Sequence, residues 1–283
     1  MGASISRRVP GTATQQPEAE RALDLSRLPP ELLLLVLSHV PPRVLLGRCR
    51  RVCRGWRALV DGQALWLLIL ARDHPALLPV ARGCLPPGVV GPKYLARFCV
   101  LRPMARNLIR NPCGQDGLQK WMVRHGGDGW LVEPNLTPVP GAPSQTCFAS
   151  SFRWCSKKQV LDLVEEGFWP ELLSSGKIEI VVSDWWGARH DCGCRYRLLV
   201  QLLDASHMTL DEFSAEPEPI EQWNNCASHH VTHVFSNIQK GLRFVSFQHW
   251  GQDTKFWAGH YGARVTNSSV IVRVCSSTPT DDC

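Results

Sequence analysis

The chain has 283 residues, of which 44% are hydrophobic and 20% are charged, and its formal net charge is +6. This composition is typical of globular proteins and excludes a chain that is disordered over most of its length. No apolar run approaches the roughly 20 residues that cross a membrane, and the N-terminus lacks the apolar core of a signal peptide, so we expect a protein that is neither secreted nor integral to a membrane.

The first residues, Met1-Gly2-Ala3-Ser4-Ile5-Ser6, satisfy the pattern for N-myristoylation of Gly2. One acyl chain binds a membrane only marginally, and Arg7 and Arg8 add the basic signal that such an anchor needs. The pattern is short and also occurs by chance. It predicts a cytoplasmic protein held peripherally on the cytosolic face of membranes, with residues 1–22 as a flexible tail.

Residues 23–66 predict a set of helices that is too short and too apolar to form an independent domain. A helix is expected over 30–40, because proline suits a first helical turn and Glu31 adds a favourable charge there. Leucine and valine cover more of this helix than the roughly 100° stripe that one contact needs. A second helical pattern follows, and a third helix is expected over 65–72.

Periodicity alone leaves two interpretations of these helices open: the core of an ordinary domain, or an array that binds a partner. Residues 1–103 hold 15 Lys and Arg against 6 Asp and Glu, whereas residues 104–283 hold 16 against 19. A basic half suits nucleic acid, anionic lipid or an acidic protein. Several arginines lie within the apolar helices, which favours an acidic protein, and we expect no nucleic-acid partner because no basic run is interleaved with stacking aromatic residues.

Three segments of this region closely resemble the F-box: Leu28-Pro-Pro-Glu-Leu-Leu, Cys49-Arg-Arg-Val-Cys-Arg-Gly-Trp, and the pair Leu65-Trp66. The resemblance covers residues 23–70. It implies docking onto the small Skp adaptor and, through it, onto the cullin and RING subunits of a ubiquitin ligase, so that the chain selects substrates and catalyses nothing. The residues that the resemblance assigns to adaptor binding are Leu28, Pro29, Leu32, Leu33, Val36, Leu37, Val52, Trp56, Leu65 and Trp66.

Prolines and glycines interrupt residues 71–103, which we interpret as a linker with a short helix near 94–98. From residue 104 onward, short apolar stretches alternate with turn-forming residues at intervals typical of a β-sandwich. The expected strands lie at 178–182, 196–203, 230–235, 242–247 and 269–274. We therefore expect an α+β multidomain chain with a small all-α helical module, an all-β sandwich over 104–277 and a short tail over 278–283.

The twelve cysteines are irregularly spaced in a chain able to bury its own core, so we expect reduced thiols and no disulfide framework. His190, Cys192 and Cys194 form one group of possible metal ligands, and Cys226 with the histidines of 229–233 forms another. Neither has the Cys-x-x-Cys spacing that zinc sites favour, and we expect no metal and no cofactor. Nucleophile-elbow, Walker and Rossmann motifs are absent.

Five segments of the second half resemble the F-box-associated domain of the sugar-recognising F-box proteins. They are Asn107-Leu-Ile-Arg-Asn-Pro-Cys-Gly, His125-Gly-Gly-Asp-Gly-Trp, Phe148-Ala-Ser-Ser-Phe-Arg-Trp-Cys, Asp184-Trp-Trp-Gly-Ala-Arg-His-Asp-Cys-Gly-Cys and Phe256-Trp-Ala-Gly-His-Tyr-Gly-Ala-Arg-Val-Thr-Asn-Ser-Ser. The resemblance implies a jelly-roll-like sandwich. It also implies that loops at one end bind the inner N-acetylglucosamine pair (chitobiose) of high-mannose N-glycans.

The resemblance implies four sugar-contacting residues. Trp257 would stack its indole on a sugar ring, since a flat apolar face suits the C–H face of a sugar. Phe152 and Phe256 would form an apolar pocket for an acetyl methyl group, and Asp191 would accept hydrogen bonds. The alternatives are a core role for Trp257 and a turn-forming role for Asp191.

The sequence departs from the family pattern at two positions of this site. Phe256 stands where the best glycan binders of the family have Tyr, so a hydroxyl is missing, and Ala258 lacks a basic side chain that some members carry. These departures keep a second hypothesis open, in which the sandwich binds a protein surface and no glycan. A third, a carbohydrate-active enzyme, needs paired carboxylates across a cleft, and only Asp191 is placed.

Overall fold

The computed structural model describes residues 25–88 and 90–275. Gly2 and the tails expected over 1–22 and 278–283 lie outside the described residues. The first part is helical. It contains α1 (Pro30–Ser38), α2 (Pro42–Gly47), α3 (Arg54–Asp61), α4 (Gln63–Asp73), α5 (Leu78–Cys84) and α6 (Val90–Leu101), with 3-10 turns at Leu25–Arg27, Cys49–Arg51 and Pro75–Leu77.

The first predicted helix is confirmed as α1, which begins at Pro30 and ends two residues earlier than expected. Its leucines divide between two surfaces: Leu33 and Leu37 are buried, whereas Leu32 is exposed. The buried leucines belong to a core that also contains Leu65 and Trp66 of α4, whose indole Nε1 donates to a backbone oxygen of α3. The helices therefore make part of their own core.

The expectation of a linker over 71–103 is wrong, because this segment is mostly helical. Three of its six prolines lie in first turns: Pro75 begins a 3-10 turn, and Pro79 and Pro92 lie near the starts of α5 and α6. A first turn tolerates proline because its N–H groups have no intrahelical partner. The sequence analysis treated these three prolines as helix breakers, whereas they mark the starts of helices.

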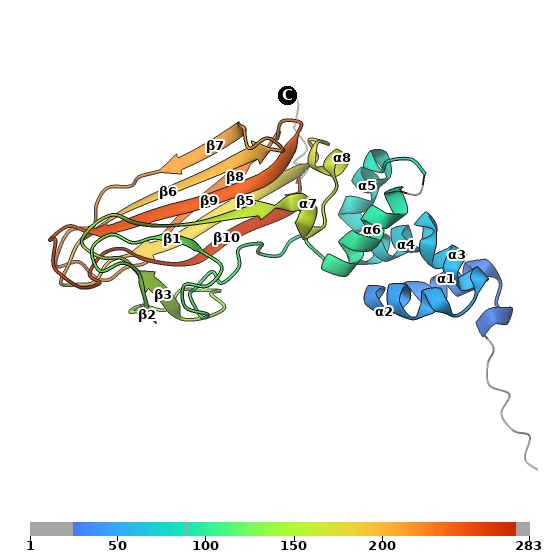
Figure 1. The fold of residues 1–283 in the computed structure, drawn as a ribbon, viewed down its shortest axis with the longest axis horizontal. Helices are drawn as coiled ribbons and strands as arrows, with labels where there is room; N and C mark the ends of the chain where they lie inside the picture. The colour runs from blue at the N-terminus through green and yellow to red at the C-terminus, as the bar shows by residue number, and fades with distance from the viewer. Residues whose placement is uncertain (1–24, 89, 276–283) are drawn as a thin grey trace, which may run out of the picture.

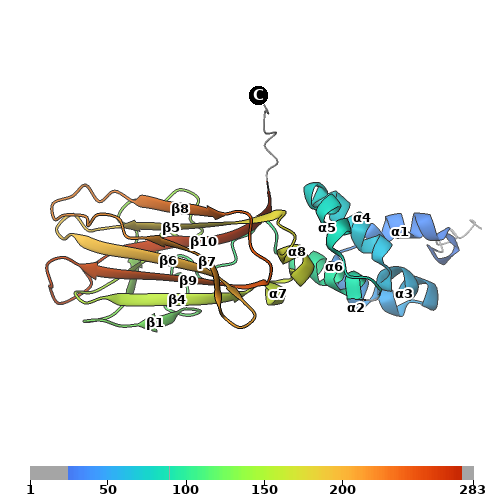
Figure 2. The same cartoon turned by 90° about the horizontal axis from the view of Figure 1, so that it is seen from above.

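The second part is a sandwich of two antiparallel sheets, as predicted (Figures 1 and 2). One sheet has the order β1-β4-β9-β6-β7 and the other the order β2-β3-β10-β5-β8. The strands are β1 (Met122–Arg124), β2 (Leu131–Pro134), β3 (Thr146–Ala149), β4 (Cys155–Asp162), β5 (Ile178–Gly187), β6 (Cys194–Asp204), β7 (Thr209–Ala215), β8 (His229–Phe235), β9 (Leu242–Asp253) and β10 (Arg264–Val274), with short helices α7 (Leu163–Glu166) and α8 (Pro170–Leu173) between β4 and β5.

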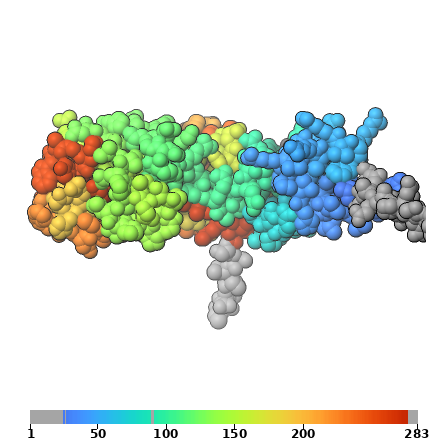
Figure 3. Space-filling view, turned by 90° about the horizontal axis from the view of Figure 1, so that it is seen from below, coloured from blue at the N-terminus to red at the C-terminus, as the bar shows by residue number. Residues whose placement is uncertain are grey.

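The helical module lies against one end of the sandwich (Figures 1 and 3), where α5 and α6 contact α8 and the residues just before it. The ring of Phe98 lies edge-on to Phe168 and Trp169, at centroid distances of 6.0 and 5.8 Å. Trp169 Nε1 also donates to the backbone oxygen of Cys84 at 3.0 Å. Because these aromatic side chains are buried and Trp169 is hydrogen-bonded, the junction is a packed interface.

A polar network lies between the two sheets. Asp184 of β5 accepts hydrogen bonds from Tyr196 of β6 (2.7 Å), His249 Nδ1 of β9 (2.6 Å) and Ser268 of β10 (2.8 Å). All four residues are buried. Burial is the main cause that lowers the pKa of His249 to about 4; Lys157 lowers it further, and Asp184 opposes the shift. His249 is therefore a neutral imidazole that donates its Nδ1 proton to Asp184.

Lys157 of β4 is also buried in this core and pairs across the sheet with His249. Its ammonium lies 3.4 Å from the ring centroid of Trp121 and 3.7 Å from that of Phe148. Burial holds its pKa well below the usual value. The aromatic faces offer the only partners described for this Nζ, which has no hydrogen-bond acceptor within the described chain.

Candidate functional site

Four connections meet at the end of the sandwich far from the helices (Figure 1). Strand register places them together, because Ala149, Gly187 and Arg264 pair across one sheet and Cys194 pairs with Asp253 in the other. The loops concerned span 125–130, 150–154, 188–193 and 254–263. All four expected sugar-contacting residues lie on three of them.

Trp257 and Phe256 are both at the surface, with 43% and 67% of their areas exposed. A core role for Trp257 is therefore excluded. Phe256 has a left-handed backbone (φ +59°), and the carboxylate of the buried Asp253 accepts hydrogen bonds from the backbone N–H groups of Phe256 and Lys255. Such a side-chain acceptor stabilises a tight turn. Asp253 therefore stabilises the turn that presents Phe256 and Trp257 at the surface.

Phe152 is half-buried beneath the glycine-rich turn of residues 125–130. A Cβ on Gly127, whose φ is +59°, would lie 2.7 Å from the Phe152 ring, so only glycine fits there. Ser151 ties the turn to the Trp257 loop: its Oγ accepts from Asp128 N (3.0 Å) and donates to Gly259 O (2.7 Å). Phe256 is exposed and Phe152 is half-buried, and a small apolar pocket formed by the two rings stays a prediction.

Asp191 is joined to the aromatic loop by a chain of contacts. Arg189 Nε donates to Asp191 at 3.0 Å, and the Arg189 guanidinium lies 4.9 Å from the ring centroid of Tyr261. Tyr261 in turn lies edge-on to Trp257, with centroids 5.8 Å apart. The hydrogen bond from Arg189 lowers the pKa of Asp191, which is therefore ionised at neutral pH and able to accept hydrogen bonds.

Sequence reasoning missed four residues that build this end: Asp128, Arg189, Asp253 and Tyr261. A signal existed for Asp253, because an aspartate two and three residues before a pair of backbone donors is a common turn-forming arrangement. No local signal linked Arg189 to Tyr261, which are distant in sequence and meet only in the folded sandwich.

The two groups of possible metal ligands are not arranged to coordinate a metal ion in the described part of the chain. Cys192 and Cys194 are buried with no shared partner, and His190 Nδ1 hydrogen-bonds to the backbone oxygen of Asn224. Within residues 25–88 and 90–275, no three His, Cys, Asp or Glu side chains are placed to hold a metal ion. The cysteines of the same residues are free thiols.

The ten expected adaptor-binding residues fall into two groups. Leu33, Leu37, Leu65 and Trp66 are buried in the core of the helical module, and their role in adaptor binding stays a prediction. Leu32, Val36 and Val52 are 51%, 41% and 57% exposed. Pro29 is exposed, and Leu28 and Trp56 are half-buried. Leu32, Leu35 and Val36 share one face of α1, which we call the α1 surface.

Two family models match this chain: "F-box-like" over residues 25–71 and "F-box associated region" over residues 99–272. The chain belongs to the F-box proteins that carry an F-box associated region. F-box only protein 27 of Mus musculus is 72% identical over 283 residues, which cover 98% of this chain and 100% of the relative. F-box only protein 27 of Homo sapiens is 74% identical over 280 residues, which cover 97% and 99%.

Among solved structures, TmCBM61 in complex with β-1,4-galactotriose resembles this F-box protein with a TM-score of 0.35 and 13% identity. The match covers 60% of this chain and 99% of that one, and it is too weak to bear on function. No helix within the described residues is both long and apolar enough to span a membrane.

Proposed function

We propose that this F-box protein is the substrate-recognition subunit of a Skp–cullin–F-box ubiquitin ligase. It binds N-glycosylated proteins exposed to the cytosol through the chitobiose core of high-mannose glycans and directs their ubiquitination. The observation that carries the proposal is the exposed indole of Trp257, joined through Tyr261 and Arg189 to the ionised Asp191.

This arrangement suits a sugar because it combines a flat apolar face with an oriented acceptor. Stacking on Trp257 would cover the C–H face of a ring, while Asp191 would accept from its hydroxyl or amide groups. Phe152 adds apolar surface beneath the neighbouring turn. The surrounding hydrogen bonds fix these loops before a ligand arrives, which reduces the ordering cost of binding.

The α1 surface is proposed as the contact with the Skp adaptor. It presents adjacent leucine and valine side chains to solvent, and the arginines of the following helices suit an acidic partner. In this proposal the protein is non-catalytic. It acts by holding a client lysine near a ubiquitin-charged enzyme, which raises the effective concentration of the two reactants. Myristoylation of Gly2 would place this activity on the cytosolic face of membranes.

Titration of chitobiose into the full chain tests the sugar-binding half. We expect Trp257→Ala to weaken binding at least about tenfold, because the main stacking surface is removed. Trp257→Phe should retain part of the affinity. Met208→Ala, which changes an exposed apolar residue in the β6–β7 turn, should retain all of it. Equal affinity of wild type and Trp257→Ala would overturn the proposal.

The exposure of Phe256 favours one alternative, in which the loop end binds a protein surface. A ring that is 67% exposed and lacks a hydroxyl is a typical protein-contact residue. Treatment of a client with an endoglycosidase distinguishes the two: capture of the client is lost if the glycan is the ligand and persists if the polypeptide is.

A further inference from the structure

The outer side of the β1-β4-β9-β6-β7 sheet carries a line of cationic and aromatic side chains. Strand register links, in order across the sheet, Arg124 of β1, Ser156 of β4, Trp250 of β9 and Arg197 of β6. Residues that pair across antiparallel strands point to the same side of a sheet. Tyr196, the neighbour of Arg197, is buried between the two sheets, so the line lies on the outer side.

Two more cations lie on the same side of the sheet. Lys158 is two residues from Ser156 along β4, and Arg195 is two residues from Arg197 along β6, so each points the same way as its neighbour in the line. The Arg197 guanidinium lies 5.9 Å from the ring centroid of Trp250. Strands about 4.8 Å apart separate the two ends of the line by roughly 14 Å. We call this set the basic face: Arg124, Lys158, Arg195, Arg197 and Trp250.

The unpaired charges of the basic face are positive. Arg197 pairs with Glu216 at 2.6 Å, whereas Arg124, Lys158 and Arg195 have no acidic partner within the described residues. The acidic side chains that border the face have partners of their own: Asp162 with Arg243, Glu166 with Arg106, and Glu212 with Gln201. The folded chain therefore leaves three cations on this side of the sandwich without a counter-charge.

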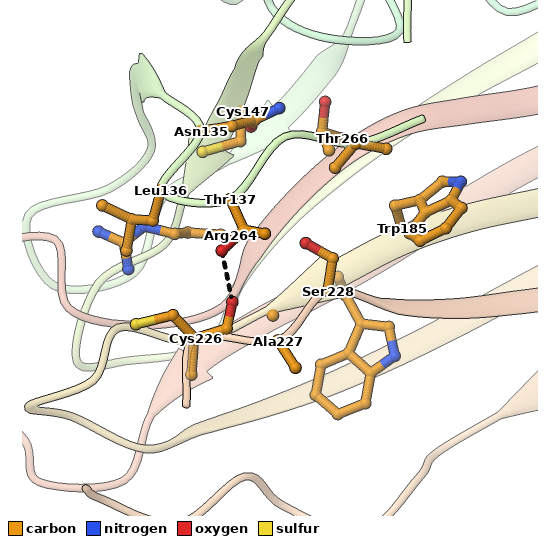
Figure 4. Close-up of a pocket in the computed structure, with 14 residues that line it drawn as sticks. Asn135, Leu136, Thr137, Cys147, Trp185, Cys226, Ala227, Ser228, Arg264 and Thr266 are labelled. Carbon is orange, nitrogen blue, oxygen red and sulfur yellow. Dashed lines mark hydrogen bonds between the residues drawn. The ribbon is translucent and has the colours of Figure 1, made fainter. Parts of the chain in front are cut away.

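The outer side of the other sheet differs, because part of the chain covers it. Residues 135–139 and 226–228 enclose a small pocket over Trp185 of β5 (Figure 4). Thr137 Oγ1 donates to the backbone oxygen of Cys226 at 3.0 Å, which joins the two covering segments. By contrast, all three arginines of the basic face are exposed. The basic face is thus open to a partner from solution.

We propose that the basic face binds the anionic lipid surface of a membrane. The inference rests on the proposed placement of this protein on the cytosolic face of membranes, which carries anionic lipid. One acyl chain on Gly2 binds a membrane only marginally and needs a second signal. Each cation close to an anionic membrane strengthens association about fivefold, so the three unpaired cations together strengthen it about a hundredfold.

Two apolar side chains favour lipid over other anionic partners. Tryptophan prefers the interface between membrane and water, and Trp250 lies among the cations. Met122, which pairs with Lys158 in register, is 57% exposed and adds apolar surface of the kind that enters the headgroup region. Single-stranded nucleic acid needs several stacking platforms, whereas the basic face offers one indole.

Binding through the basic face is compatible with glycan binding. The sheet forms one side of the sandwich, and the loops of Trp257 lie at the end far from the helical module (Figures 1 and 2). A membrane on this side leaves those loops uncovered. Substitutions in the basic face should therefore leave chitobiose binding unchanged.

Sedimentation with vesicles tests the inference on the full chain carrying Gly2→Ala, so that no acyl chain contributes. At low ionic strength we expect this parent chain to bind vesicles of equal parts phosphatidylcholine and phosphatidylserine, and not vesicles of phosphatidylcholine alone. The triple variant Arg124→Gln, Lys158→Gln and Arg195→Gln should weaken binding to the mixed vesicles about a hundredfold. The matched control removes the same charge at three exposed lysines outside the face and should bind as the parent chain does. Its changes are Lys93→Gln, Lys177→Gln and Lys240→Gln.

Equal binding by the triple variant and its control, or binding that does not depend on phosphatidylserine, would overturn the inference. Binding of the parent chain to polyglutamate and not to the vesicles would assign the basic face to an acidic protein, and would also overturn it. Acylation fails separately: a chain that cells do not acylate but that binds mixed vesicles through these cations refutes the acylation of Gly2 alone. An acylated chain whose affinity for mixed vesicles is unchanged by the triple variant refutes the basic face alone.

Discussion

Acidification should destabilise the sandwich through His249. The folded protein keeps this imidazole neutral down to a pKa of about 4, whereas in the unfolded chain it takes up a proton near its ordinary pKa of 6.5. Between these values the unfolded state binds more protons, so the free energy of unfolding falls as the pH falls. The loss should be about 2 kcal/mol between pH 7 and pH 5 and about 3 kcal/mol once the pH is below 4.

Urea unfolding followed by tryptophan fluorescence at several pH values measures this loss. His249→Asn places an amide donor near the position of Nδ1, so it can still donate to Asp184 but cannot titrate. The variant should lose less stability than wild type between pH 7 and pH 5, whatever its stability at neutral pH. The exposed His207→Asn is the matched control and should keep the wild-type pH dependence. Parallel pH profiles for wild type and His249→Asn would refute the reasoning.

Three further predictions concern the surfaces. Leu32→Asp puts a charge on the exposed α1 surface and should weaken binding to the Skp adaptor at least about tenfold in a pull-down titration. Leu131→Asp, at an exposed leucine in the sandwich, should bind as wild type does, and equal binding by both variants would contradict this. Asp253→Ala should weaken chitobiose binding about tenfold by releasing the Phe256 turn. Asp253→Asn keeps an acceptor and should retain most of the wild-type affinity. Equal losses of affinity in the two variants would show that the charge of Asp253, and not its role as an acceptor in the turn, is what matters. Gly2→Ala should abolish incorporation of a clickable myristate analogue and reduce the membrane-bound fraction, and unchanged labelling would exclude acylation of Gly2.

The sequence predicted the centres of the main strands because their apolar stretches are long and bounded by turn-forming residues. Strand ends were underestimated: β9 continues to Asp253 through polar residues that pair in the sheet interior. The helix near 94–98 was predicted but is longer, as α6, and α5 was missed. Pro79 and Pro92 lie in the first turns of these helices, whereas the sequence analysis took each proline as a boundary.

Function-related contacts were harder to predict than strands. Periodicity identified the leucines of α1 but could not assign Leu33 to the chain's own core and Leu32 to the surface, since that depends on where α4 packs. Likewise, Trp257 came from resemblance to a family, whereas its link to Asp191 through Arg189 and Tyr261 depends on two loops that meet only after the sheets form.

The arrangement of the two parts bears on how such an adaptor would select a lysine. The α1 surface belongs to the helical module, and the loops of Trp257 lie at the opposite end of the sandwich (Figure 1). Because Phe98 and Trp169 pack the junction, the separation is fixed by the folded chain and not by a flexible tether. The glycan would therefore be held at one distance from the ligase machinery, and the client lysines reached would depend on their position relative to the glycosylated asparagine. A change in the junction should then alter which lysines are modified while leaving both binding surfaces intact.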